Sequence, residues 1–68
     1  MTVRVRLNGE PRELPDGCTI VQAVAELTAA ATGVAAAVNG DVVPRGSWAA
    51  TSLRDGDQVE VVTAVQGG

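Results

Sequence analysis

Hydrophobic and polar residues alternate at the start of the chain. The apolar positions of this alternation are Val3, Val5 and Leu7. Because alternate side chains of a strand point to opposite faces, the pattern predicts a strand over 2–7 with one buried face. Asn8-Gly9 follows, and both residues accept the positive φ of a tight hairpin turn. A second strand over 10–14 is therefore expected beside the first, and Pro11, which lacks an N–H, places it at a sheet edge.

After the turn residues 15–17, the spacing of apolar residues changes to three or four. The apolar stripe consists of Ile20, Val24, Leu27 and Ala31. Thr19, with Gln22 three positions later, has the pattern of a capping box at the start of a helix. Gly33 is the natural stop. These signals predict one helix that packs its apolar stripe against a sheet.

Short apolar runs separated by turn residues fill the rest of the chain. The predicted elements are a short buried strand over 34–38, a tight turn at Asn39-Gly40, a strand over 41–43 ended by Pro44, a helical turn over 47–51, a turn at 55–57 and a last strand over 58–65. The order predicts an α+β fold, with a mixed sheet of four to five strands and one helix across one face. No linker divides the chain. We therefore expect one domain over 1–64, followed by a flexible tail over 65–68 that ends in Gly-Gly.

A chain of 68 residues allows only one small hydrophobic core. The expected core residues are Val3, Val5, Leu7, Leu14, Ile20, Val24, Leu27, Val34, Val38, Val43, Leu53, Val59 and Val61. Burial of these side chains is largely offset by conformational entropy. Little stability remains for an internal catalytic cavity.

Charge and cysteine content narrow the class of partner. The formal charge is −3, with five arginines scattered among eight acids, which argues against nucleic acid and favours a basic partner surface. No apolar run approaches the length of a membrane span, and Met1 leads directly into the alternating pattern rather than into a signal peptide. Cys18 has no second cysteine with which to pair. We therefore expect a soluble cytoplasmic protein without a membrane partner.

The side chains that usually perform catalysis are scarce. Histidine, lysine and tyrosine are absent from the sequence, so the commonest general bases and Schiff-base amines are missing. Cys18 has only the neighbouring helix start to lower its pKa, so we interpret it as a small packing residue. Asp55 and Asp57 provide too few ligands for a divalent metal ion and are typical of a turn. The sequence predicts no catalytic residue and no metal site.

The sequence ends in Val65-Gln66-Gly67-Gly68. Glycine has no Cβ, so a Gly-Gly end can enter a channel that is too narrow for other residues and place its carboxyl carbon beside a bound reagent. The carboxylate of Gly68 is therefore the candidate working group, with Gln66 and Gly67 threading a partner's active site. The alternative is an ordinary frayed end.

Several side chains are candidates for partner contact, and each has a structural alternative. Trp48, the only aromatic residue, either fills the sheet edge or stays exposed as a contact anchor. Arg45 is either solvated or recognises an acidic group. Val62 points either outward into an interface or into the protein. Val65, the first residue of the tail, is the fourth candidate.

One series of residues carries a family resemblance over essentially the whole chain. The residues are Asn39-Gly40-Asp41-Val42-Val43-Pro44-Arg45-Gly46-Ser47-Trp48, then Leu53, Asp55-Gly56-Asp57-Gln58-Val59-Glu60-Val61-Val62, and Gly67-Gly68. Together with the chain length and Asn8-Gly9, they closely resemble the ThiS family, the sulfur-carrier proteins of thiamine biosynthesis. The resemblance implies a ubiquitin-like β-grasp fold.

The resemblance also implies a reaction and its partners. A ubiquitin-activating-like adenylyltransferase of the ThiF type would use Mg-ATP to convert the carboxylate of Gly68 into an acyl adenylate. Sulfur from a persulfide donor would then give a thiocarboxylate, which donates sulfur to a thiazole synthase of the ThiG type. The protein would be a cosubstrate rather than an enzyme and would bind no cofactor itself.

Other functions remain open on the sequence alone. The small subunit of molybdopterin synthase shares the fold and the Gly-Gly ending but is usually longer and richer in aromatic residues. Carriers for cysteine synthesis or tRNA thiolation use the same tail chemistry. A protein modifier would instead attach Gly68 to target lysines, and a passive interaction domain would keep its activity without Gly68.

Overall fold

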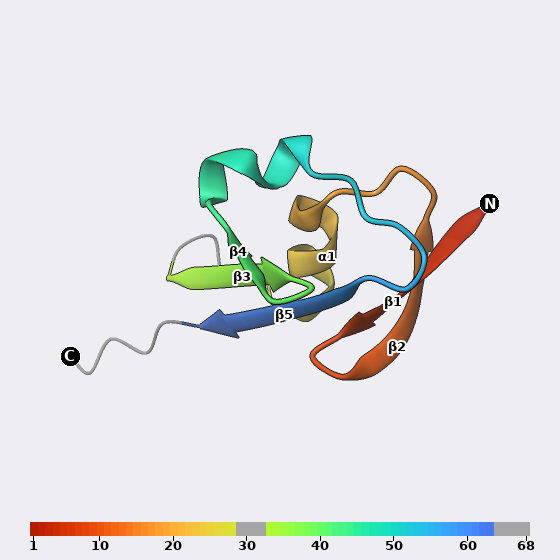
Figure 1. Ribbon diagram of the computed structural model, residues 1–68, viewed down its shortest axis with the longest axis horizontal. Coiled ribbons are helices and arrows are strands. Elements are labelled where there is room, and N and C mark those ends of the chain that lie inside the picture. Colours follow the sequence, from red (N-terminus) through yellow and green to blue (C-terminus); the bar gives the residue numbers. More distant parts are fainter. Residues whose placement is uncertain (29–32, 64–68) are drawn as a thin grey trace.

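A five-stranded mixed sheet carries one α-helix across one of its faces (Figure 1). The computed structural model describes residues 1–28 and 33–63. Its elements are β1 (Thr2–Leu7), β2 (Glu10–Pro15), α1 (Ile20–Leu27), β3 (Val34–Val38), β4 (Asp41–Val43), a 3₁₀ helix η1 (Arg45–Ala50) and β5 (Gln58–Thr63). The strand order is β2-β1-β5-β3-β4. The predicted fold class and the edge position of β2 are confirmed.

Both predicted Asn-Gly hairpins are present. Asn8 and Gly9 have φ values of 51° and 85°, and Asn39 and Gly40 have φ values of 52° and 89°. Positive φ at both central residues is the geometry of a type I′ turn, whose twist matches that of the flanking strands. Each turn therefore joins an antiparallel pair, β1 with β2 and β3 with β4.

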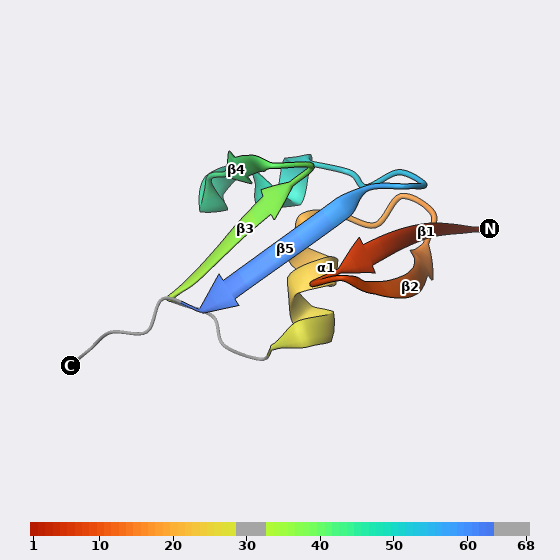
Figure 2. The same ribbon diagram turned by 60° about the horizontal axis from the view of Figure 1, so that its bottom comes forward.

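The last strand lies between the two hairpins (Figure 2). It runs parallel to β1 and antiparallel to β3. The side chain of Asn8 continues the ladder beyond the end of β1, because its Nδ2 donates to the carbonyl of Val61 at 3.1 Å and its Oδ1 accepts from the N–H of Val61 at 2.8 Å. On the other side, Oδ1 of Asn39 accepts from the N–H of Gln58 at 3.0 Å. The two turn asparagines thus hold β5 as well as forming their hairpins.

The core lies between α1 and the sheet. Most of the predicted core residues are buried: Val3, Val5, Leu7, Leu14, Ile20, Val24, Leu53, Val59 and Val61. The other predicted core residues pack against this cluster and are partly buried: Leu27, Val34, Val38 and Val43. Cys18, Ala23, Ala36 and Trp48 are buried as well. Because the side chains of Ala23 and Ala36 are small, the helix and the sheet can approach closely.

The helix begins as predicted but ends early. At its start, the N–H of Thr19 donates to Oε1 of Gln22 at 2.9 Å, which is one half of the expected capping box. At its end, Thr28 has an extended backbone, with φ −155° and ψ 147°. The prediction that the helix continues to Gly33 is therefore wrong, because β-branched Thr28 has a weak helix propensity and the chain already leaves the helix there. Ala31 lies outside the described residues.

The other predicted elements are present with small shifts. The helical turn expected over 47–51 is η1, which begins two residues earlier at Arg45. The last strand ends at Thr63 in the described part of the chain. Its expected continuation through residue 65, the domain boundary after residue 64 and the predicted flexible tail lie outside the described residues.

We predict that Asn8→Ala lowers the free energy of unfolding by about 2 kcal/mol. The variant loses two hydrogen bonds to Val61 and places a Cβ-bearing residue without a polar side chain at positive φ. Urea unfolding followed by circular dichroism measures the change. Asn8→Gly is the matched control, because it removes the same bonds without backbone strain and should lose about 1 kcal/mol less. Equal stability of Asn8→Ala and the wild type would contradict the role of this clamp.

Candidate functional site

The side of the sheet opposite α1 is open, and β5 divides its side chains between the two faces. Val59 and Val61 are buried on the face that packs against α1. Gln58, Glu60 and Val62 are exposed on the opposite, open face. Val62 is 61% exposed, compared with 7% for Val61. The interpretation of Val62 as an outward-pointing residue is confirmed.

Four small apolar side chains gather on this open face, and we call them the apolar patch: Val62, Ala35, Ala37 and Val42. The strand register joins them, since Val62 lies opposite Ala35 and Ala37 lies opposite Val42. Val42 is 74% exposed. The apolar patch therefore crosses three neighbouring strands, from β5 through β3 to β4, and the exposed Glu60 lies opposite Ala37 on the same face. Apolar side chains gathered on an exposed face are typical of an interaction site.

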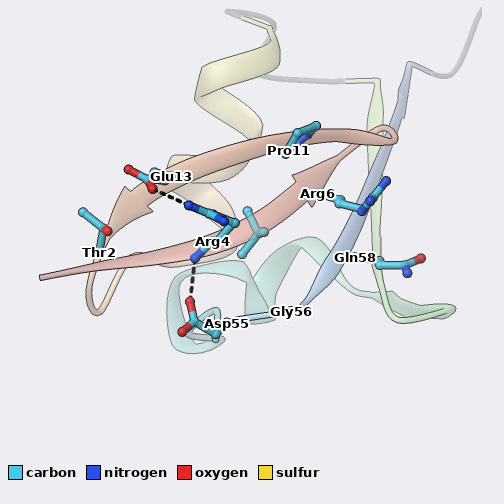
Figure 3. A pocket seen from close by; sticks show the side chains of 9 residues that line it. Thr2, Arg4, Arg6, Pro11, Glu13, Asp55, Gly56 and Gln58 are labelled. Carbon is cyan, nitrogen blue, oxygen red and sulfur yellow. Dashed lines mark hydrogen bonds and ion pairs between the residues drawn. The ribbon is translucent and has the colours of Figure 1, made fainter.

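The same face is hollowed on its other side, over β1 and β2 (Figure 3). The hollow is a shallow groove of about 660 Å³. We call it the arginine groove and define it by Arg4, Arg6, Pro11, Glu13 and Gln58. Arg4 forms an ion pair with Glu13 at 3.0 Å across the strands. The open face thus has a charged half and an apolar half.

Asp55, which closes one end of the arginine groove, belongs to the turn predicted over 55–57. Its Oδ1 accepts from the N–H of Arg4 at 2.6 Å, and the N–H of Gly56 donates to the carbonyl of Arg4 at 2.8 Å. Oδ2 of Asp57 accepts from the N–H of Arg54 at 2.8 Å. The carboxylates of this turn therefore hold backbone donors, which confirms its structural interpretation.

Trp48 is a packing residue. Its side chain is 5% exposed, and its Nε1 donates to the carbonyl of Val43 at 2.9 Å. The alternative of an exposed contact anchor is therefore wrong for the indole itself. Arg45, which is exposed, lies with its guanidinium carbon 5.3 Å from the ring centroid and covers the indole. A partner that reaches this corner would meet Arg45 rather than Trp48.

Cys18 is buried next to the start of α1, with 1% of its surface exposed. Burial raises the pKa of its thiol, because desolvation disfavours the thiolate, and the charge of Asp16 acts in the same direction. A backbone hydrogen bond opposes this increase only in part. An inaccessible, protonated thiol is a poor nucleophile, so the packing interpretation of Cys18 agrees with its position.

The structure describes only part of the predicted site. Val65, Gln66, Gly67 and Gly68 lie outside the described residues. Thr63, at the end of β5, lies opposite Val34 at the start of β3. Within residues 1–28 and 33–63, no cluster of three or more His, Cys, Asp or Glu residues is positioned to hold a metal ion. Over the same ranges, no helix has the length and apolar character needed to cross a membrane.

A mixed sheet of this order with one helix across one face defines the ubiquitin-like β-grasp class of small domains. The crystal structure of a thiamine biosynthesis protein, ThiS, from Geobacter metallireducens has the same fold, with a TM-score of 0.80 and 29% sequence identity. The similarity covers 97% of this chain and 100% of that one. The structural comparison therefore extends over the whole domain.

The sequence comparisons identify the family. The ThiS family model matches residues 5–68, and the chain belongs to this family. The sulfur carrier protein ThiS of Thermus thermophilus is 42% identical over 64 residues, which are 94% of this chain and 98% of that protein. A thiazole synthase from Magnetococcus marinus is 38% identical over 66 residues, and the chain spans only 20% of its length.

The raised pKa of Cys18 predicts a dependence of stability on pH. The unfolded thiol loses its proton near its ordinary pKa of 9.0, whereas the folded thiol keeps the proton to higher pH. The free energy of unfolding is therefore unaffected by this thiol below pH 9.0. It falls as the pH rises from 9.0 through the pKa of the folded thiol, because the unfolded chain loses its proton first. Urea unfolding at pH 8 and pH 10 should show a larger loss of stability for the wild type than for Cys18→Ala. An equal loss in both proteins would contradict the prediction.

Proposed function

We propose that this protein carries sulfur for thiamine biosynthesis on the carboxyl group of Gly68. The observation that carries the proposal is the family match, which extends to residue 68 and includes the Gly-Gly sequence. The Thermus thermophilus relative is a sulfur carrier of nearly the same length. In this function the protein is a cosubstrate, and its partners perform the catalysis.

The first step is activation of the carboxylate, which by itself has no adequate leaving group. An adenylyltransferase of the ThiF type would bind Mg-ATP, and a carboxylate oxygen of Gly68 would attack the α-phosphorus with release of pyrophosphate. The resulting acyl adenylate has AMP as its leaving group. Glycine suits this position because the carboxyl carbon can approach the nucleotide without a neighbouring Cβ.

The second step exchanges oxygen for sulfur. The terminal sulfur of a persulfide would attack the acyl carbon and displace AMP, which leaves an acyl disulfide. A thiol would then cleave the sulfur–sulfur bond, so that the thiol and the former persulfide carrier form a disulfide and Gly68 keeps one sulfur as a thiocarboxylate. A thiocarboxylate is ionised at neutral pH, and its sulfur is a stronger nucleophile than the oxygen of a carboxylate.

The acceptor would be a thiazole synthase. The match of the whole domain to a fifth of a thiazole synthase supports this pairing, because it places a carrier-like segment and a synthase within one longer protein. Gly68 would deliver sulfur at the synthase's active site, and Gln66 and Gly67 would thread the channel that leads to it.

The apolar patch is the proposed docking surface for the adenylyltransferase. It extends over three strands, and its most C-terminal member, the exposed Val62, lies on the strand that leads to Gly68. Val62 and Gly68 are six positions apart in the sequence, so a partner that covers Val62 has the carboxyl group within about 20 Å of extended chain. Arg45 and Val65 are proposed to contact the partner at the edge of this surface.

We predict that deletion of Gly68 abolishes sulfur loading without loss of stability. The truncated chain still ends in a carboxylate, but that group lies one residue short of the reacting position. Intact mass spectrometry after incubation with the adenylyltransferase, Mg-ATP and a sulfur source measures the exchange of one oxygen for sulfur. The intact mass also tests whether Gly68 is the last residue. Full loading of the truncated chain would contradict the proposed function.

A second prediction concerns the apolar patch. Val62→Ser should raise the KM for adenylation about tenfold, because it puts a hydroxyl into an apolar contact, and should change the free energy of unfolding by less than about 0.5 kcal/mol. Val21→Ser is the matched control, since Val21 is 45% exposed on α1 rather than on the open face. Equal KM values for the two variants would remove the apolar patch from the docking surface.

A further inference from the structure

Some arginine side chains in the described part of the chain form ion pairs with carboxylates, and others do not. Arg4 is paired with Glu13 at 3.0 Å, and Arg12 is paired with Glu26 at 3.4 Å. The guanidinium of Arg6 has no carboxylate within ion-pair distance in residues 1–28 and 33–63. Its one hydrogen bond there, at 3.5 Å, is from Nη1 to the carbonyl of Gly9 in the hairpin. Arg6 thus presents a charge that other carboxylates of the described chain leave unpaired.

Arg6 is also placed beside a second polar side chain. The register of the parallel strands β1 and β5 puts Arg6 opposite Gln58. Both side chains lie on the open face, and both point in the same direction, away from the ion pair of Arg4 and Glu13 (Figure 3). Both residues line the arginine groove, and the guanidinium and the amide each carry N–H donors for a planar acceptor group.

We propose that Arg6 and Gln58 bind a carboxylate side chain of the adenylyltransferase when it docks on the open face. This inference rests on the proposed function and specifies the chemistry of the partner's surface. The arginine groove and the apolar patch are two parts of one face, because Gln58 and Val62 lie on the same side of β5. One partner can therefore cover the apolar patch and place an acidic residue over Arg6.

The surrounding charges favour a single carboxylate over a polyanion. Glu13, Asp55 and Glu60 are exposed on or beside this face, and the whole chain has a formal charge of −3. A nucleic-acid backbone would bring several phosphates close to these acids, and each approach would be repelled. One carboxylate can form a planar, two-bond contact with the guanidinium of Arg6 and brings only a single negative charge to this face.

The contact at Arg6 and Gln58 would determine how the adenylyltransferase is oriented on the open face. A mostly apolar contact such as the apolar patch permits several rotations of one protein on the other, because the hydrophobic effect is non-directional. An arginine–carboxylate contact on the other half of the face is directional and selects one rotation. The selected rotation would direct residues 64–68 toward the nucleotide.

The test compares two charge reversals with the same change in net charge. The assay follows the release of pyrophosphate by the adenylyltransferase as the concentration of this protein is varied. Arg6→Glu should raise the KM for this protein by about tenfold or more and leave kcat within about twofold. Arg54→Glu is the matched control, because Arg54 is exposed in the loop before β5 and does not line the arginine groove. Its KM should change by less than about threefold. Arg6→Gln, with a smaller disturbance of β1, should lie between wild type and Arg6→Glu, and thermal unfolding monitors the fold of each variant.

Equal KM values for the Arg6→Glu and Arg54→Glu variants would overturn the inference, because the effect would then come from net charge alone. The same conclusion follows if a folded Arg6→Gln variant has the wild-type KM and the wild-type salt dependence. A failure of the proposed function is distinguishable, because the wild-type chain itself would then release no pyrophosphate with the adenylyltransferase and Mg-ATP.

Discussion

The position of β5 between the two hairpins is the constraint on which the rest of the structure depends. It is the strand through which the β1–β2 pair and the β3–β4 pair become one sheet. Its hydrogen bonds come from both sides, and the side chain of Asn8 extends them to Val61, beyond the end of β1. Because β5 leads into the sequence that ends at Gly68, the strand that unites the sheet also fixes the point from which residues 64–68 begin.

This arrangement separates stability from recognition on the two faces of one strand. Val59 and Val61 contribute to the core beneath α1, whereas Gln58, Glu60 and Val62 stay exposed on the open face. A domain of this size has one small core, and within residues 1–28 and 33–63 no second layer covers the open face. The open face is thus available for a partner, and substitutions there can change binding with little effect on folding.

Local patterns were sufficient to predict most of the elements. Alternation predicted β1, and the Asn-Gly pairs predicted both hairpins because those residues tolerate positive φ. The end of α1 was predicted wrongly, since the apolar spacing continued to Ala31 whereas the helix ends at Leu27. The burial of Ala23 and Ala36 was missed, because alanine is common both in cores and on surfaces and its small side chain carries little signal.

The candidate site was less predictable, because most of it is made by contacts between distant segments. Nothing local in the sequence indicates that Arg6 lies opposite Gln58, since that pairing depends on the register of two parallel strands. The role of Trp48 was undecided until the structure placed its Nε1 against the carbonyl of Val43. Only the outward direction of Val62 followed from alternation within its own strand.

The small size of the side chains in the apolar patch agrees with the proposed role of a carrier that serves two partners in succession. In that proposed role the same carboxyl group would be activated at one protein and would give up its sulfur at another, so the first complex would have to dissociate before the second forms. Two alanines and two valines provide less apolar area than the aromatic and large aliphatic residues that usually dominate tight interfaces. A modest apolar contact combined with a directional charge at Arg6 would favour correct orientation with fast dissociation, because affinity differences lie mostly in the dissociation rate.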